Sequence, residues 1–535
     1  MRPHRLLLAA ALLAAAALGA CRCGRREPLP SATPLPPPAR WLPAAAEGAV
    51  VVPDLGALGD RLRALEGLKV AGFAAQLQGF GTAQEWVGGF LGQVGLDLRS
   101  REALVAAGVD ASRGAAAAWS PDGAVLAVAV QDAAKLEALL GKLARSRLGA
   151  SAPVKSGALT TWSRADGAPV LGLLQVEGAG LVASGTAATR LEGWGRLPAE
   201  QSLARDAAFA SACKRLGGTA LAWARVPPGT RWGEPRAAEV PGMTAALRAS
   251  ADSLSVEVEL DAVPAGWDAA ALAAAGGAQP PFAALPRDAV AWAWYGGDPT
   301  RLKVLAETLL GERGRRALEA ASVQLESGLL GSVHPGLAAS LSVAPSIQFG
   351  AVPELDVRRT NPFRYVHVVG AARVKDAPAV ERLLEVLPGV APSFGARMER
   401  AQRAGRAVLL SSYSQGEGLH LAVHEGRVIA ASPESRLLEA LGGAGQAGAQ
   451  AGTGMPAPAQ QEAQRWPLAV VVDLHRLAAA VRALPGDAWG PGGSFVKAGW
   501  VRWLDGTDDL SWVLAGARAQ EGRLQLHLSL GLGRP

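Results

Sequence analysis

The stretch VQDAAKLEALL, at residues 130–140, has a near copy in VKDAPAVERLL, at residues 374–384. In both segments the third residue is aspartate, and apolar residues spaced three and four apart follow it. Such spacing places apolar side chains on one face of a helix, toward a core. Aspartate is a preferred N-cap, because its carboxylate accepts hydrogen bonds from the first free N–H groups. Both segments therefore predict an apolar strand that ends at an aspartate-capped helix.

Other parts of the chain repeat as well. Three further matches keep their order: Asp54 and Leu58 with Asp298 and Leu302, residues 171–184 with 419–432, and residues 252–255 with 508–511. Several matches in one order, with slowly drifting spacing, indicate duplication. We expect two tandem, related domains at residues 41–262 and 285–535, joined by an Ala-, Gly- and Pro-rich linker at 263–284.

The strand–aspartate–helix pattern recurs through both halves. The aspartates expected to cap helices are Asp54, Asp132, Asp298, Asp376 and Asp473. We expect each cap to contribute about 1 kcal/mol. Their role is structural and not catalytic.

Alternating residues and tight Gly turns set the expected fold class. Leu524, Leu526 and Leu528 alternate with polar residues, which predicts a half-exposed strand. Alternation with such turns favours antiparallel hairpins. We therefore expect an α+β fold, each domain a largely antiparallel sheet with helices packed on one face. Residues 442–464 lack periodicity and are expected to form a flexible loop.

The first 20 residues have the composition of a secretory signal. Arg2 and Arg5 precede an unbroken Leu/Ala run at residues 6–17. About 20 apolar residues are needed to span a membrane, so this run is too short. An ordinary cleaved signal peptide is one interpretation.

Leu18-Gly19-Ala20-Cys21 resembles the lipobox of bacterial lipoproteins. That resemblance implies cleavage before Cys21 and acylation of this cysteine. It also implies membrane attachment through the N-terminal acyl chains. Arg22, in place of an acidic residue, resembles the outer-membrane sorting pattern of enterobacterial lipoproteins. We expect a lipid-anchored envelope protein, at the outer membrane facing the periplasm more than at the inner membrane.

A Pro-rich run at residues 28–40 follows the anchor. Such runs favour extended polyproline II. Residues 21–40 are therefore expected to be a lipidated cysteine and its tether. Beyond them, Cys213 lies in an apolar helical context, where a buried and unreactive thiol is expected.

Charge excludes one class of partner. The 535 residues carry a net charge of +6, but five arginines lie in the first 26 residues. Without those five, the chain has 48 of its 53 basic residues and 47 acidic residues, so the two kinds of charge nearly cancel. A nearly neutral body has no electrostatic footprint for nucleic acid.

No motif for metal, cofactor or catalysis is present. His420 and His424 are four apart, but on the predicted strand they would lie about 13 Å apart and face the surface. Asp505 to Asp509 lacks the spacing of a calcium loop and is expected to form a hairpin turn. No Walker loop, nucleophile elbow or dinucleotide fingerprint occurs. We expect no cofactor and no enzymatic activity.

Tryptophans are the remaining signal. The candidates are Trp292 and Trp294 on one strand, and Trp500, Trp503 and Trp512 around a C-terminal hairpin. They belong either to a core or to an apolar groove. The preferred hypothesis is an interaction or scaffold protein whose partner is another envelope protein. A carrier of a hydrophobic ligand is the alternative, and a hydrolase without a recognisable motif is the third.

Overall fold

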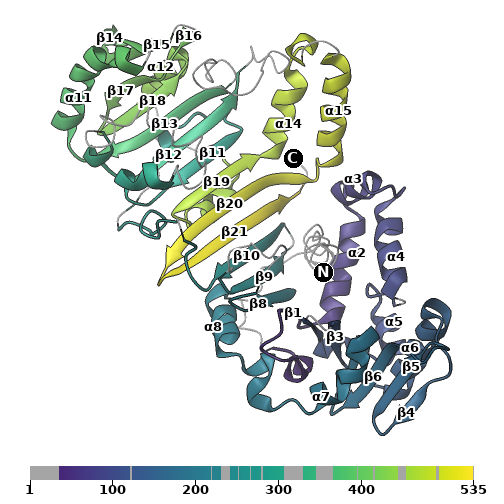
Figure 1. Ribbon diagram of the computed structural model, residues 1–535. Coiled ribbons are helices and arrows are strands. Elements are labelled where there is room, and N and C mark those ends of the chain that lie inside the picture. Colours follow the sequence, from purple (N-terminus) through teal and green to yellow (C-terminus); the bar gives the residue numbers. More distant parts are fainter. Residues whose placement is uncertain are drawn as a thin grey trace. The chain divides into compact units, whose positions relative to one another are not determined.

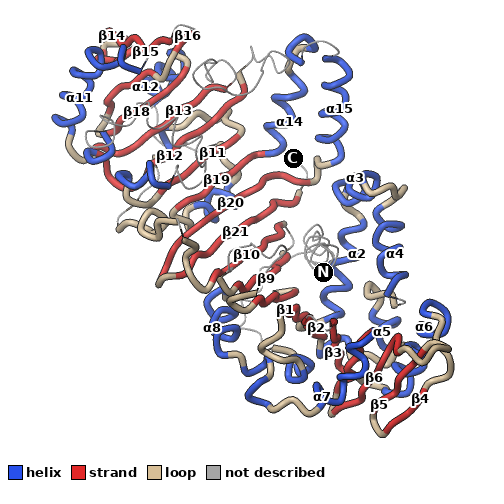
Figure 2. Tube along the Cα trace, in the orientation of Figure 1, coloured by secondary structure: helices blue, strands red, loops and turns tan. Residues whose placement is uncertain are grey.

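The computed structural model (Figures 1 and 2) divides into two compact units, Met1–Ala262 and Val263–Pro535. It describes residues 35–533 except for 95, 121–122, 218–219, 231–240, 251, 266, 277, 279–280, 306–328, 345–365, 395, 414–415, 444–453 and 490–492. Each unit combines helices with a large antiparallel sheet, as the alternation predicted. The signal peptide and Cys21 lie outside the described residues.

Unit 1 contains a sheet in which every pairing is antiparallel. Its strands are β1 (Gly48–Val52), β2 (Ala115–Ser120), β3 (Gly123–Ala129), β4 (Val154–Ser156), β5 (Leu159–Ser163), β6 (Pro169–Val176), β7 (Ala179–Ser184), β8 (Ala222–Val226), β9 (Met243–Ala249) and β10 (Ser253–Leu260). Their order across the sheet is β10-β9-β8-β1-β2-β3-β7-β6-β5-β4 (Figure 1).

The helices of unit 1 cover both faces of this sheet. The α-helices are α2 (Leu55–Glu66), α3 (Lys69–Leu77), α4 (Ala83–Val94), α5 (Arg101–Ala106), α6 (Ala133–Leu148), α7 (Leu191–Gly195) and α8 (Ala207–Leu216), and the 3-10 helices are η1 (Pro37–Trp41), η2 (Ala111–Arg113), η3 (Gly185–Arg190), η4 (Ala199–Gln201) and η5 (Leu203–Arg205). In β2, Ala116 lies in one core cluster with Phe209 of α8, whereas Ala115 lies in another with Leu136 of α6. Neighbouring strand residues point to opposite faces, so the prediction that helices cover one face is wrong.

The end of the predicted tether is part of the unit 1 core. Ala39, in η1, and Leu42 are fully buried. The Arg40 Nη1 donates to the Leu197 carbonyl oxygen at 2.9 Å. The prediction of an extended tether is therefore wrong for residues 35–40, because their apolar side chains are used to complete a core.

Unit 2 also has a sheet made of antiparallel pairs. Its strands are β11 (Ala291–Tyr295), β12 (Val333–Val343), β13 (Val366–Val374), β14 (Ala396–Arg403), β15 (Arg406–Tyr413), β16 (Gly416–Glu417), β17 (His420–His424), β18 (Arg427–Ser432), β19 (Leu468–Asp473), β20 (Leu510–Gln520) and β21 (Arg523–Leu532). Their order is β21-β20-β19-β11-β12-β13-β18-β17-β15-β14, and β16 also pairs with β15.

Helices pack on both faces of this sheet too, but only over part of it. The described α-helices are α11 (Ala377–Val390), α12 (Glu434–Gly443), α13 (Ala457–Ala463), α14 (Leu474–Ala483) and α15 (Gly493–Gly506), and the 3-10 helices are η6 (Phe282–Ala284), η7 (Pro299–Arg301), η9 (Leu330–Ser332), η12 (Ala391–Phe394) and η14 (Gly486–Trp489). In β17, Ala422 packs with Leu437 of α12, and its neighbour Leu421 packs with Leu387 of α11.

Three segments of unit 2 differ from their predictions. Within 442–464, residues 457–463 form α13, whose Ala459 and Ala463 are buried one turn apart, so this part is no flexible loop. Within the predicted linker 263–284, Ala271 is fully buried and its carbonyl accepts from the Tyr295 hydroxyl at 2.8 Å. Residues 500–506 belong to α15 and not to a hairpin, because Leu504 is buried against α14.

The five aspartates expected as caps lie at the starts of helices. Each side chain accepts a hydrogen bond from a backbone N–H two or three residues ahead; the donors belong to Ala57, Ala134, Thr300, Ala379 and Arg476. The helix that follows Asp298 is the short 3-10 helix η7. These bonds satisfy N–H groups that a helix start leaves without a partner.

Candidate functional site

The five candidate tryptophans do not form one groove. Trp292 and Trp294 of β11 and Trp512 of β20 are buried in the main core cluster of unit 2. Trp500 and Trp503 lie on α15 and are 50% and 40% exposed. The prediction that they crowd a hairpin with Trp512 is wrong, because the segment that carries them folds as a helix.

An exposed apolar row crosses the sheet of unit 2. Ala293, Val470, Ala515 and Leu528 stand opposite one another on β11, β19, β20 and β21. All four are exposed, and the exposed fractions of Val470 and Leu528 are 42% and 47%. We call these four residues the open sheet face. Contiguous exposed apolar surface of this kind marks interaction sites in soluble proteins.

Unit 1 has a similar row. Val50, Ala117, Leu126 and Val182 stand opposite one another on β1, β2, β3 and β7. Leu126 is 42% exposed, and the other three are half-buried. Each unit therefore presents a row of apolar side chains across four adjacent strands of its sheet.

The last strand of each unit explains why this side is apolar. In β21 the polar Gln525, His527 and Ser529 are buried, and the His527 ring stacks on Trp466, which follows α13, with 4.9 Å between centroids. Gly516 makes room for that indole, since a Cβ there would lie 2.6 Å from the ring. The Leu side of β21 therefore faces away from α13, and sequence alternation alone did not indicate which side would be covered.

In β10 one polar residue is buried as well. Glu259 is fully buried, and its carboxylate accepts hydrogen bonds from the Arg215 guanidinium of α8 at 2.5 to 3.1 Å. Val256 and Val258 are half-buried on the other side. Charge pairing with Arg215 of α8 thus accounts for the burial of Glu259.

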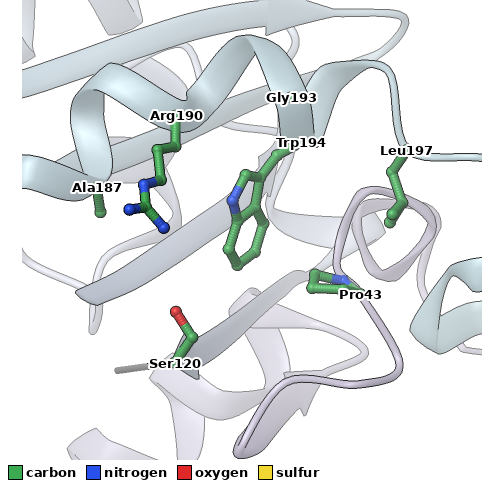
Figure 3. A pocket seen from close by; sticks show the side chains of 7 residues that line it. All are labelled: Pro43, Ser120, Ala187, Arg190, Gly193, Trp194 and Leu197. Carbon is green, nitrogen blue, oxygen red and sulfur yellow. The ribbon is translucent and has the colours of Figure 1, made fainter. Parts of the chain in front are cut away.

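A pocket of about 270 Å³ opens in unit 1 (Figure 3). Arg190 and Trp194, from η3 and α7, point into it toward Ser120 of β2, and Pro43 and Leu197 form its other side. Sites for drug-sized ligands begin at about 300 Å³. The pocket is therefore somewhat small for a lipid, and it combines a cation with apolar walls.

His420 is part of a buried hydrogen-bonded network. Its Nδ1 accepts from the Ser411 backbone N–H at 3.0 Å, and its Nε2 lies 3.2 Å from a Glu417 carboxylate oxygen. With Nδ1 an acceptor, Nε2 carries the proton and donates to Glu417. The prediction of a surface-facing His420 is wrong, because this network buries the ring to 3% exposure. Neither nitrogen is placed to accept a proton from a serine hydroxyl.

Metal and thiol chemistry have little support in the described part of the chain. No group of three or more His, Cys, Asp or Glu side chains there is arranged to hold a metal ion. Cys213 is buried on α8, and this burial raises the pKa of its thiol to about 12. The thiol is therefore protonated and unreactive at neutral pH.

Comparisons with known proteins identify no family. No family model and no curated protein matches the sequence. A solved structure titled "Structure of crystal form I of TP0453" aligns at 11% identity over 42% of this chain and 77% of that chain, with a TM-score of 0.23. At that TM-score the likeness decides neither fold nor function. No helix among the described residues is long and apolar enough to cross a membrane.

Proposed function

We propose that this protein is a non-enzymatic, lipid-anchored protein of the cell envelope that binds a partner protein through the open sheet face of unit 2. The observation that carries the proposal is the exposed row that includes Val470 and Leu528. Apolar side chains on the face of an antiparallel sheet are normally covered. A partner surface that covers them would remove apolar area from water, which favours association.

The anchor belongs to the same proposal. Its support is the lipobox-like LGAC at residues 18–21 and the basic and apolar segments before it. Two or three acyl chains hold a protein at a membrane far more firmly than one. We place the protein at the outer membrane, facing the periplasm.

Replacement of Cys21 by alanine is expected to abolish acylation. In a bacterial host fed a clickable fatty acid, the wild-type chain should carry the label and Cys21→Ala should not. The matched control is Cys23→Ala, which leaves the lipobox unchanged and should be labelled like the wild type. Equal labelling of the Cys21 and Cys23 variants would show that the lipobox interpretation is wrong.

Internal duplication is the proposed origin of the two units. It is supported by the strand orders, since β1, β2 and β3 hold the same places in unit 1 as β11, β12 and β13 hold in unit 2, and the remaining strands correspond in turn. The capping aspartates Asp132 and Asp376 precede corresponding helices, α6 and α11. An experimental structure with unlike strand orders in the two units would contradict the duplication.

A hydrophobic-ligand carrier remains the second candidate, because the open sheet face would also accept an acyl chain. A photoreactive residue in place of Leu528 separates the two in intact cells. We expect a discrete protein adduct at position 528 and none at Val386 on α11, which is somewhat more exposed. A lipid-sized adduct by mass spectrometry would favour the carrier, and no adduct at position 528 would contradict both functions.

A further inference from the structure

Helix α15 has apolar side chains on two sides. Leu504 on the inner side is buried with Ala478 and Val481 of α14. On the outer side, Phe495, Val496, Trp500 and Trp503 are 87%, 41%, 50% and 40% exposed. We call these four residues the aromatic face of α15. In Figure 1 the helix lies beside α14, and its outer side is the one away from that helix.

The aromatic face is ordered by its own contacts. The rings of Trp489 and Trp500 have centroids 6.4 Å apart, and those of Trp500 and Trp503 are 6.0 Å apart and nearly perpendicular. Edge-to-face packing is a favoured arrangement of aromatic rings. The exposed Trp500 side chain therefore packs against the buried Trp489, and Trp503 packs against Trp500.

A basic side chain flanks this face. At 100° per residue, the exposed Arg502 lies next to Phe495 at one edge of the face, whereas Lys497 lies beyond Leu504 and its ammonium donates to the Leu484 carbonyl oxygen at 2.6 Å. The other nearby cation, Arg482 of α14, pairs with Asp505 at 2.5 Å. Aromatic residues on one side with Lys and Arg beside them are typical of helices that lie in a membrane–water interface.

The area of the aromatic face of α15 indicates whether a protein or a membrane can cover it. A helix of 14 residues is about 21 Å long and about 10 Å wide, so it offers on the order of 200 Å². A stable protein–protein interface needs about 800 Å² on each partner. A narrow ridge that ends in Phe and Trp suits insertion between lipid headgroups, where Trp is enriched, and not a protein interface of standard size.

We infer that the aromatic face of α15 inserts into the headgroup region of an anionic phospholipid bilayer. The inference rests on the proposed lipid anchor, which keeps the body close to that surface. The segment from Cys21 to Leu35, where the described part of unit 1 begins, reaches at most about 50 Å. A face too small for strong binding on its own becomes effective in a chain that is anchored to the same bilayer, because a second site on a tethered molecule acts intramolecularly.

The test uses the full acylated chain with Cys23→Ser and Phe495→Cys, labelled at position 495 with an environment-sensitive fluorophore. Cys213 is buried and does not compete for the label. The protein is mixed with vesicles of phosphatidylethanolamine and phosphatidylglycerol, with or without nitroxide on the lipid chains. The matched control carries the label at Val386→Cys on α11, which is 56% exposed.

We expect the label at position 495 to shift to the blue, to brighten severalfold and to be quenched by nitroxide lipid, whereas the label at 386 does none of these. Adding Trp500→Ser and Trp503→Ser should remove the quenching at 495. Flotation with the vesicles reports the acyl anchor separately. Flotation without quenching at 495 overturns the inference and leaves the anchor standing. Quenching at 495 in a chain that is not acylated supports insertion of the face and shows that it binds the bilayer without the anchor. A blue shift without quenching shows a protein contact and overturns it.

Discussion

Trp292→Ala is expected to lower the free energy of unfolding of unit 2 by about 3 to 5 kcal/mol. Trp292 is 2% exposed on β11 and lies between Ser340 of β12 and Val471 of β19 in the sheet. Its ring also lies under the Arg476 guanidinium, 5.8 Å from the ring centroid. Truncation would leave a large cavity that a sheet on one side and helices on the other cannot close.

The matched control is Trp500→Ala on α15. Its side chain is half-exposed, so we expect a loss of about 1 kcal/mol or less. Urea unfolding followed by far-ultraviolet circular dichroism measures both variants under the same conditions. Similar losses for the two tryptophans would mean that Trp292 is not a core residue or that Trp500 is not a surface one. That result would also weaken the proposed role of the aromatic face of α15.

Arg215→Ala is expected to destabilise unit 1 by about 3 kcal/mol. Glu259 is fully buried, and its carboxylate accepts three hydrogen bonds from the Arg215 guanidinium. Without that cation the carboxylate stays buried with its principal partner gone. We expect the lower end of the range for buried pairs, because the Arg215 side chain is 30% exposed and water reaches it.

A second substitution checks this explanation. Arg215→Met combined with Glu259→Leu should recover most of the lost stability, because an apolar pair of similar volume needs no desolvation of charge. Arg63→Ala serves as a surface control. Its partner Asp60 is 71% exposed, so the loss should stay below about 0.5 kcal/mol. Equal effects at Arg63 and Arg215 would contradict the account of a buried pair.

Local elements were predictable because their signals act over a few residues. Asp132 bonds backbone groups two and three positions ahead, and the pattern that identified it needs no distant partner. The strand at residues 524–530 was predictable from its period of two. The antiparallel pairing followed from short turns between such strands.

Prediction failed where packing between distant segments decided the outcome. Residues 500–504 form a short apolar run, and such a run is compatible with either a strand or a helix. Contacts of Leu504 with α14 favour the helix. Residues 457–463 are short and rich in Ala and Pro, yet Ala459 and Ala463 have space against the core and form α13. Neither the core below them nor its shape is visible in the local sequence.

The amino-acid sequence by itself determined the fold class, the strand–aspartate–helix order and the near-neutral charge of the body, because these depend on residue type and short spacing. Only the tertiary structure decided which side of each strand is exposed. Alternation makes two faces of β21 but cannot say that the Trp466 indole stacks on His527 and that Leu528 is left at the surface. Burial depends on which other segment of the chain packs against the strand, and the sequence of the strand does not contain that information.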